Sequence, residues 1–211
     1  REDPCDMFLS VRHDSLEALP AGARVGTSSL RRKAQLAAIR RDLDITDLRG
    51  NLDTRVGKLT DGLFDAIVVA AAGLNRLALS APKAVRLTPP RFLPAAAQGA
   101  LGIEYRLDDP ETAAMLAFFD HPESRDAVAA ERAFLARLEG GCQVPIAAHA
   151  VLDGDALTLS GLVAHPDSGE TYRDTVNGRR ADAAALGRAL ADALLARGAK
   201  ALLDAVCKEG V

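Results

Sequence analysis

The stretch FDAIVVAAA, residues 64–72, is a nearly continuous apolar run that ends at Gly73. Such a run is typical of a strand that is buried on both faces of a parallel sheet. The residues before it alternate between short apolar runs and helical spacing, which predicts strands at 23–25 and 44–48 and helices at 30–42 and 52–63. Strand–helix–strand–helix–strand in this order predicts a parallel α/β layer.

A second unit follows a proline-rich crossing segment at 80–98. We expect a strand at 101–106, and Asp109 with Pro110 is typical of a helix start, the helix continuing to about residue 119. Beyond it the patterns predict a helix at 123–138, strands at 146–152, 156–164 and 171–176, and helices at 182–197 and 199–208. The fold class is therefore an α/β lobe with a parallel sheet, followed by a small α+β domain with a three-stranded antiparallel sheet.

The bulk composition is that of a soluble globular protein, because 48% of the 211 residues are hydrophobic and 26% are charged. No apolar run reaches the length of a membrane span, so we expect no membrane association. Residues 1–4 (REDP) resemble neither a signal peptide nor an initiator sequence, which suggests that an N-terminal part is absent. Cys5, Cys142 and Cys207 lack the spacing of a disulfide framework or a zinc site, so we expect no metal and a reducing, cytoplasmic location.

The net charge of −3 conceals a basic segment. Between residues 24 and 76 there are ten basic and six acidic side chains, so the acidic excess lies in the rest of the chain. A basic segment in an acidic protein suggests an anionic ligand. Nucleic acid is disfavoured, because aromatic residues make up only 4% of the chain and do not interleave with the basic ones.

The sharpest local signal is GTSSLRR, residues 26–32, where a predicted strand turns into a helix. This is the usual ligand position in an open α/β sheet, and the free N–H groups of a hydroxyl-capped helix start suit an anion. Arg31 and Arg32 in the first helical turn oppose the helix dipole and repel each other. A carboxylate or phosphate ligand would relieve both costs, whereas the alternative is a solvated basic surface.

Further arginines follow the other predicted strands. Arg49 lies at the carboxyl end of the strand at 44–48, Arg55 lies on the next helix, and Arg76 follows the strand at 64–72. A guanidinium group is planar, always charged and able to bind a carboxylate through two hydrogen bonds. Several such groups converging on one sheet edge predict a ligand with several carboxylates.

The helix at 123–138 leads into a loop that carries a thiol. Gly140 and Gly141 allow the left-handed backbone that ends a helix, and Pro145 prevents the helix from resuming. Cys142 is then either a small core residue, as free cysteines usually are, or a thiol held for chemistry at the end of a rigid element. The loop by itself leaves both interpretations open.

Six short motifs occur in one order along the chain: VGTSSLRR (25–32), LRGNLDTR (48–55), FDAI (64–67), AGLNRL (72–77), QGALGIE (98–104) and LEGGCQVPIA (138–147). Together they resemble the porphobilinogen deaminase family, also called hydroxymethylbilane synthases. The resemblance implies a transferase that condenses four porphobilinogen molecules into the linear tetrapyrrole hydroxymethylbilane and releases ammonia at each step. It also implies a dipyrromethane cofactor that primes the chain and is attached through a thioether to the loop cysteine, here Cys142.

The resemblance also assigns the ligands of the pyrrole carboxylates. Each pyrrole ring carries an acetate and a propionate, so the growing chain is a polyanion that arginines can bind, and a covalent tether keeps it in place through several cycles. The side chains that match the family's ligands by position are Thr27, Ser29, Arg31, Arg32, Arg49, Arg55, Arg76 and Gln98. A monomer without a metal ion is implied.

The family has three domains, and the resemblance divides this chain among them. Residues 1–22 connect into the second domain, 23–97 form that domain with a lobe of the periplasmic-binding-protein type, 98–120 return to an otherwise absent first domain, and 121–211 form the third domain with the cofactor cysteine. Because the absent segment carries the family's catalytic aspartate, we expect the chain to be inactive by itself.

Small departures from the family pattern are Asn75, Ala97 and Tyr105, where lysine, glycine and cysteine are common. None of them lies in the cysteine loop. The alternative function from another class is a non-catalytic anion-binding module of the periplasmic-receptor type, whose α/β lobe would have a similar sequence pattern.

Overall fold

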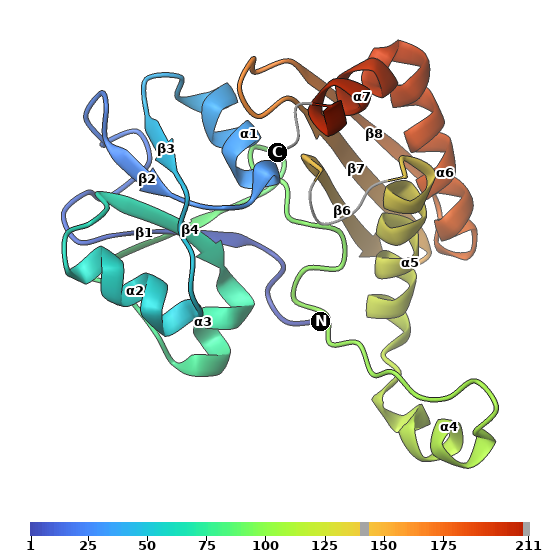
Figure 1. Cartoon of the computed structure of the whole chain (residues 1–211). Helices are drawn as coiled ribbons and strands as arrows, with labels where there is room; N and C mark the ends of the chain where they lie inside the picture. The colour runs from blue at the N-terminus through green and yellow to red at the C-terminus, as the bar shows by residue number, and fades with distance from the viewer. Residues whose placement is uncertain (140–143, 209–211) are drawn as a thin grey trace.

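The computed structural model describes residues 1–139 and 144–208. Figure 1 shows a first lobe built on a five-stranded sheet, a second lobe built on a three-stranded sheet, and a projecting arm that carries α4. The strands of the first lobe are β1 (Asp6–Ser10), β2 (Arg24–Gly26), β3 (Asp44–Thr46), β4 (Ala66–Ala70) and β5 (Lys83–Leu87), and its helices are α1 (Leu30–Ile39), α2 (Leu52–Thr60) and α3 (Ala71–Leu77).

The five strands lie in the order β3-β2-β4-β1-β5. β2 is parallel to β3 and β4, whereas β1 is antiparallel to β4 and to β5. Four strands therefore share one direction, and the predicted α/β class with a mostly parallel sheet is confirmed. Two details differ from the prediction. First, β1 is antiparallel to both of its neighbours. Second, the expected crossing segment at 80–98 contains the strand β5, a short alternation of polar and apolar residues between two prolines.

The core of the first lobe is packed against both faces of β4. Its alternate residues point to opposite faces of the sheet. Val68 packs on one face with Phe8 and Leu36 of α1, and Ile67 packs on the other face with Leu59 of α2. The prediction of a strand buried on both faces is therefore confirmed. Because β2, β3 and β4 are parallel, their carboxyl ends lie at the same edge of this packed sheet.

The second lobe contains β6 (Ile146–Asp153), β7 (Ala156–Ala164) and β8 (Thr171–Arg179) in an antiparallel sheet. Its helical part consists of α5 (Pro122–Arg137), η2 (Arg180–Asp182), α6 (Ala183–Leu194), η3 (Leu195–Ala199) and α7 (Lys200–Lys208). Phe134 of α5 and Leu190 of α6 pack on this sheet as part of one core. A Cβ atom at Gly187 would lie 2.3 Å from the backbone oxygen of Ala130, so glycine is what lets α5 and α6 approach so closely. The predicted small α+β unit is confirmed.

The two lobes meet along α1. Ala34 of α1 and Leu93 of the crossing segment pack against Ala147, Leu162 and Ala164 of the three-stranded sheet. The backbone N–H of Ala148 also donates to the carbonyl oxygen of Pro94 at 3.1 Å. The helix that follows the GTSSLRR motif therefore belongs to the first lobe and forms the boundary with the second.

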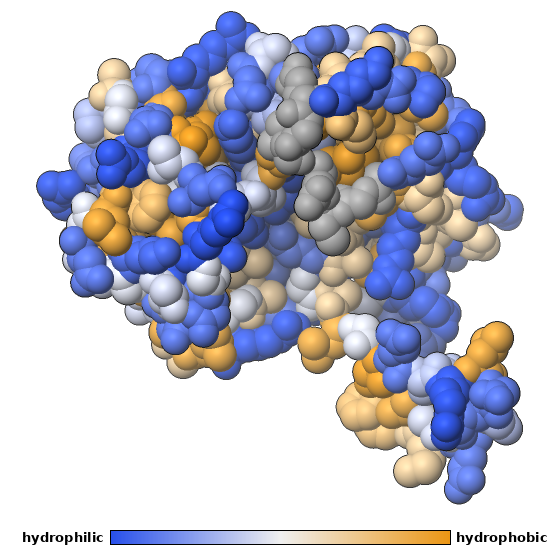
Figure 2. Space-filling model, in the orientation of Figure 1, coloured by the Kyte–Doolittle hydropathy of each residue, from blue (hydrophilic) through white to orange (hydrophobic). Residues whose placement is uncertain are grey.

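The projecting arm, which lies between the two lobes in the sequence, carries α4 (Pro110–Leu116) and η1 (Ala117–Phe119). The predicted helix start is confirmed, because the Asp109 side chain accepts a hydrogen bond from the N–H of Thr112 at 2.9 Å. The predicted strand at 101–106 is wrong, because residues 101–106 form no strand and pair with none in the described part of the chain. Figure 2 shows hydrophobic residues gathered on the arm, and its exposed apolar side chains are Leu101, Ile103, Tyr105, Leu107, Met115, Phe118 and Phe119.

In the described ranges, no helix combines the length and the apolar character that a membrane crossing requires.

Candidate functional site

The site is built at the start of α1, where β2 ends. Ser29 is the N-cap, and its side chain accepts a hydrogen bond from the N–H of Arg32 at 3.4 Å. The hydroxyl oxygen of the buried Thr27 accepts from the N–H of Ser29 at 3.3 Å. Ser28 binds both backbone groups of Leu48 at 3.0 Å, which ties this turn to the end of β3. The predicted hydroxyl cap is confirmed, and the turn is held rigidly.

A buried carboxylate lies beside the two arginines of this turn. Asp6, the first residue of β1, is 0% exposed. Arg31 donates to it at 2.6 Å through Nη1, and Arg32 donates at 2.7 Å through Nη2. The cost of two cations in a first helical turn is thus relieved by a residue of the chain itself, whereas the sequence indicated a ligand or solvent in that place.

We call Asp6, Arg31, Arg32 and Gln98 the Asp6 cluster. The Gln98 side chain accepts from Arg31 at 3.2 Å and donates to Asp6 at 3.1 Å and to the carbonyl oxygen of Pro4 at 2.6 Å. One carboxylate faces two guanidinium groups, so the cluster carries an excess of one positive charge away from water. A buried unpaired charge is costly, and a bound anion would compensate it.

The titration of the cluster reflects this excess. Burial would raise the pKa of Asp6, but the charges and hydrogen bonds of Arg31 and Arg32 outweigh burial and hold that pKa below its ordinary value. Burial lowers the pKa of Arg32, Asp6 raises it again, and the positive charges of Arg31 and Arg55 lower it further. Arg55 is therefore close enough to Arg32 to act on its charge.

Arg49 and Arg55 lie on the loop and first turns after β3. The Arg49 side chain is 84% exposed and pairs with Asp47 at 3.3 Å. Arg55 donates through Nε to the carbonyl oxygen of Gly50 at 2.7 Å. Both follow β3, the neighbour of β2 in the parallel part of the sheet, as the sequence predicts. Arg49 is exposed and Arg55 is half-buried, and both offer positive charge on the same sheet edge as the Asp6 cluster.

Arg76, at the end of α3, points elsewhere. It donates to the carbonyl oxygen of Gly99 at 3.2 Å. It lines a hollow of about 730 Å³ beneath the arm, together with Arg1, Arg125 and Arg132. The nearby Gln98 belongs to the Asp6 cluster, so residues 98–99 join the hollow to that cluster. The predicted arginines therefore form a buried pair, a more accessible pair after β3 and a separate Arg76, rather than one continuous row.

A second buried carboxylate lies on α5, in a group that we call the Glu131 cluster. Arg1 pairs with Glu131 at 2.7 Å, and the N–H groups of Ala97 and Ala150 donate to the same carboxylate at 2.6 Å and 2.8 Å. Arg1 also donates to the carbonyl oxygen of Gln98 at 3.0 Å. The Glu131 cluster thus holds the N-terminal segment, the crossing segment, α5 and β6 together.

Cys142, with Gly140 and Gly141, lies outside the described residues, and its predicted role stays a prediction. The described residues on either side of it are informative. Leu138 is buried in the core of the second lobe, and Val144 packs against the same core. Leu30, the first residue of α1, packs there too. Both the start of α1 and a flank of the cysteine loop therefore rest on one core.

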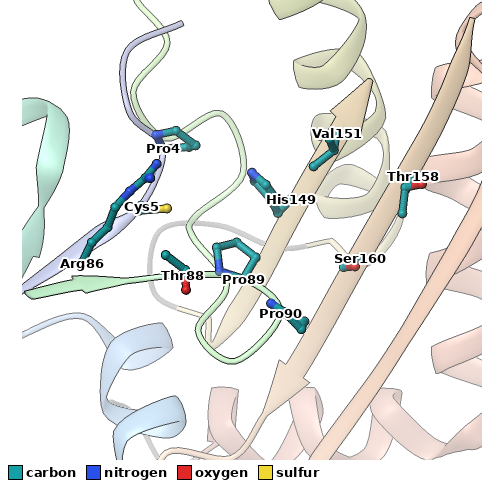
Figure 3. A pocket seen from close by; sticks show the side chains of 10 residues that line it. All are labelled: Pro4, Cys5, Arg86, Thr88, Pro89, Pro90, His149, Val151, Thr158 and Ser160. Carbon is teal, nitrogen blue, oxygen red and sulfur yellow. The ribbon is translucent and has the colours of Figure 1, made fainter. Parts of the chain in front are cut away.

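An open groove of about 400 Å³ runs between the lobes away from these residues. Figure 3 shows Cys5, Arg86 and the Thr88–Pro90 turn on one side and His149, Val151 and Ser160 of the sheet on the other. Burial, together with the charges of Arg1 and Arg86, lowers the pKa of His149 to about 4. The candidate ligand residues do not line this groove, so it is a separate feature of the junction.

Sequence reasoning did not single out Asp6, Glu131 or Arg1. The available signal for Asp6 was a charged residue at the head of an apolar strand, DMFLS. The signal for Glu131 was an acidic residue at a position that α5 buries. In the described ranges, no three His, Cys, Asp or Glu side chains gather where they could hold a metal ion.

Comparison with known proteins gives two family matches. Residues 1–114 match the model described as porphobilinogen deaminase, dipyromethane cofactor binding domain, and residues 126–196 match porphobilinogen deaminase, C-terminal domain. The chain is 59% identical over all 211 residues to the porphobilinogen deaminase of Nitratidesulfovibrio vulgaris strain DP4, covering 67% of that protein. It is 58% identical over 206 residues to that of Maridesulfovibrio salexigens, covering 98% of this chain and 67% of the relative.

Proposed function

This chain belongs to the porphobilinogen deaminase family, and from that premise we propose that it takes part in joining four porphobilinogen molecules head to tail into hydroxymethylbilane. Family membership makes it a transferase of tetrapyrrole and heme biosynthesis with a dipyrromethane cofactor-binding domain. In the proposed reaction each porphobilinogen loses its amino group as ammonia when it is added, and water releases the finished tetrapyrrole. No observation favours the anion-binding receptor as an alternative.

One observation carries this proposal: the Asp6 cluster presents an excess of one buried positive charge at the carboxyl end of β2. Such a site fits a ligand made of acetate and propionate groups, because a carboxylate would complete the charge balance. The exposed Arg49 and the half-buried Arg55 extend the positive charge along the same edge. We propose that Thr27, Ser29, Arg31, Arg32, Arg49, Arg55 and Gln98 hold or position the cofactor and the growing chain, and that Arg76 acts from the neighbouring hollow.

We propose Cys142 as the attachment point, through a thioether, of the dipyrromethane cofactor. Support comes from its flanks, since Val144 and the first residue of α1 pack on the same core. A tether at that place would keep a short pyrrole chain beside the arginines through successive additions. When bound, the cofactor supplies the pyrrole end to which the first porphobilinogen is joined.

We further propose the division of the chain into a connector (1–22), a second domain (23–97), a returning segment of a first domain (98–120) and a third domain (121–211). The arm supports this division, because its apolar side chains are exposed: Leu107 is fully exposed and Phe118 is 76% exposed. Exposed apolar patches of this kind mark interaction surfaces. Relatives are longer, since the chain covers 67% of their length, and we propose that their N-terminal segment packs on this arm.

The test joins the N-terminal segment of the Nitratidesulfovibrio vulgaris relative to Arg1 and measures the intact mass of the purified protein. We expect an adduct of two pyrrole units, a colour with Ehrlich's reagent, and formation of hydroxymethylbilane. The Cys142→Ser variant of the same protein should lack the adduct and remain folded. An adduct that persists on the serine variant would disprove the assignment of the anchor.

The 211-residue chain alone is the matched control. We expect neither adduct nor turnover, because the chain spans 67% of the length of its relatives and we propose that the remaining part of the relatives carries the catalytic aspartate. Hydroxymethylbilane formation by the chain alone would contradict the proposed need for that segment.

A further inference from the structure

The groove between the lobes lies on the face of the three-stranded sheet that looks toward the first lobe. His149 and Ser160 are direct partners in the register of β6 and β7, as are Val151 and Thr158, so these four side chains point to one face. Ala147, two residues before His149, points to the same face and packs against the first lobe. The groove is therefore the end of the lobe interface at which the sheet is left uncovered.

The opposite wall of the groove comes from the first lobe and from the turn after β5. Figure 3 shows Arg86 and the Thr88–Pro90 turn on one side and His149 and Val151 on the other. The volume of about 400 Å³ lies within the range of small-molecule sites, roughly 300–1,000 Å³. The prolines of the turn and the side chain of Val151 make the walls largely apolar. A small molecule in the groove would touch both lobes.

His149 is the polar side chain of the sheet that is available to a ligand. Its ring points from β6 into the groove (Figure 3), and among the described residues it has no hydrogen-bond partner. The neighbouring hydroxyl groups are engaged within the sheet, since Thr158 donates to Asn177 at 2.7 Å and Ser160 is bonded to Thr175 at 2.9 Å. The imidazole is thus left to meet a ligand.

The charges around the groove favour an anion. Burial and the positive charges of Arg1 and Arg86 lower the pKa of His149 to about 4, so its ring is neutral at physiological pH and can donate one N–H. Arg86 donates to Asp3 at 2.7 Å through Nη2, which uses one of its five guanidinium donors. One guanidinium group and one ring N–H between apolar walls match a planar carboxylate better than a dianion such as phosphate.

We propose that the groove is a second binding site, which takes a small carboxylic acid with an apolar body. The carboxylate accepts hydrogen bonds from Arg86 and from the ring of His149, and the apolar body lies between the Thr88–Pro90 turn and Val151. Because the molecule contacts both lobes, its binding holds them in their present arrangement. The residues proposed to hold the pyrrole chain do not line this groove, so the inference is independent of the proposed function.

The first measurement titrates the 211-residue chain with benzoate and uses benzamide as the neutral molecule of the same shape. Calorimetry should show saturable binding of benzoate with a Kd on the order of 1 mM, as is usual for so small a ligand. Benzamide should bind at least about tenfold more weakly, because it lacks the negative charge.

The ring of His149 reports directly on the groove. Its NMR signals, assigned by their loss in His149→Gln, should shift as benzoate is added. The pKa of His149 should rise from about 4, because a bound carboxylate offsets the positive charges of Arg1 and Arg86. Asp3 pairs with Arg86 in the free protein and is the competing carboxylate.

Two variants of the walls should weaken binding and leave the fold intact. Arg86→Gln removes a half-exposed guanidinium group and should weaken benzoate binding by about tenfold or more. Val151→Asp places a negative charge on a wall position that is 51% exposed and should abolish binding. The matched controls are Arg91→Gln and Val11→Asp, which change exposed residues of the first lobe outside the groove and should leave the affinity unchanged.

Asp3→Asn should act in the opposite direction. The amide oxygen can still accept from the N–H of Cys5, as Asp3 does at 2.9 Å, but the charge that competes for Arg86 is gone. Benzoate should therefore bind roughly two- to fivefold more tightly, in line with the strength of an exposed ion pair. A purely structural role of Arg86 would give no such gain.

No saturable binding of benzoate, or equal binding of benzamide, would overturn the inference. An affinity that is unchanged in both Arg86→Gln and Val151→Asp would do the same. Arg32→Gln decides whether benzoate binds in the Asp6 cluster instead. Binding that is lost in this variant but kept in Arg86→Gln, with unmoved signals of His149, would place the ligand in that cluster and refute the groove site.

Discussion

Asp6 in the first lobe and Glu131 in the second are both fully buried carboxylates, yet their surroundings differ in charge. Asp6 meets two guanidinium groups and the amide of Gln98. Glu131 meets one guanidinium group and two backbone N–H groups. The first cluster keeps an excess of positive charge, whereas the second is neutral and closed.

This difference in charge indicates that the Asp6 cluster is a binding site and that the Glu131 cluster has a structural role. The neutral Glu131 cluster satisfies its partners within the protein, and it fastens the segments that cross between the lobes. The Asp6 cluster is left with a charge that only an additional anion can balance. Residues 97 and 98 link the two clusters, since Ala97 donates to Glu131 and the next residue, Gln98, donates to Asp6. Adjacent residues of the crossing segment therefore contact the two buried carboxylates.

The largest effect on stability is expected for Asp6→Ala. The variant leaves two buried guanidinium groups facing each other without a counter-charge, and breaking a buried pair costs about 3–5 kcal/mol. Urea unfolding of the 211-residue chain measures this loss. Adding Arg32→Gln to the variant should recover part of it, because one buried charge fewer remains. The control Asp108→Ala changes an exposed aspartate and should leave the unfolding midpoint unchanged.

Glu131→Gln should destabilise the chain by a smaller amount, about 1–3 kcal/mol. The amide keeps one acceptor for Ala97 or Ala150 but turns a donor toward the other N–H group and weakens the pair with Arg1. Urea unfolding again provides the measurement, and Glu104→Gln on the exposed arm is the control. A loss larger than that of Asp6→Ala would contradict the view that excess charge distinguishes the two clusters.

The two carboxylates should also respond to pH in opposite directions. The pKa of Asp6 is lowered from its ordinary 3.8, so its stabilising effect is present above that value and is lost as pH falls through the lowered pKa. Burial raises the pKa of Glu131 above its ordinary 4.5, despite the opposing effects of Arg1 and two N–H donors. The contribution of Glu131 to the stability of the fold is therefore largest below pH 4.5 and is lost as pH rises through the raised pKa.

Unfolding free energies measured against pH for wild type, Asp6→Asn and Glu131→Gln check these signs. The advantage of wild type over Asp6→Asn should shrink as the solution is acidified below about pH 4. Its advantage over Glu131→Gln should instead grow as the pH falls through the raised pKa of Glu131 toward the ordinary 4.5. Parallel curves for the two variants would show that the clusters titrate alike.

The fold was largely predictable because its signals are local. The apolar run around β4 and the helical spacing of α1 and α2 each depend on neighbouring residues, and burial on both faces of the sheet confirmed them. The strand expected at 101–106 failed because pairing needs a partner strand, and periodicity does not supply one. β5 was missed because prolines on both sides outweighed a five-residue alternation.

The candidate site was predictable only in part. The position of Arg31 and Arg32 at the end of β2 follows from the motif, but their direction is set by Asp6, which lies 25 residues away from Arg31. A lone aspartate at the head of a strand gives no local sign of its partners. The same holds for Glu131, whose partner Arg1 is 130 residues away. Ion pairs between residues far apart in the chain could therefore not be predicted from local sequence patterns.

The smallest effect is expected at Ala97, which donates to Glu131 and directly precedes Gln98 of the Asp6 cluster. Ala97 has φ of 62°, in the left-handed region, where a side chain costs about 1–2 kcal/mol. The hydrogen bond from its N–H to Glu131 holds it there. Ala97→Gly should therefore raise the unfolding free energy by about 0.5 kcal/mol, because relief of strain exceeds the added backbone entropy of the unfolded chain. The same change at Ala156, an exposed residue of β7 without this strain, should destabilise instead. If both glycines destabilise alike in urea unfolding, Ala97 is not strained, and Glu131 is not needed to hold it.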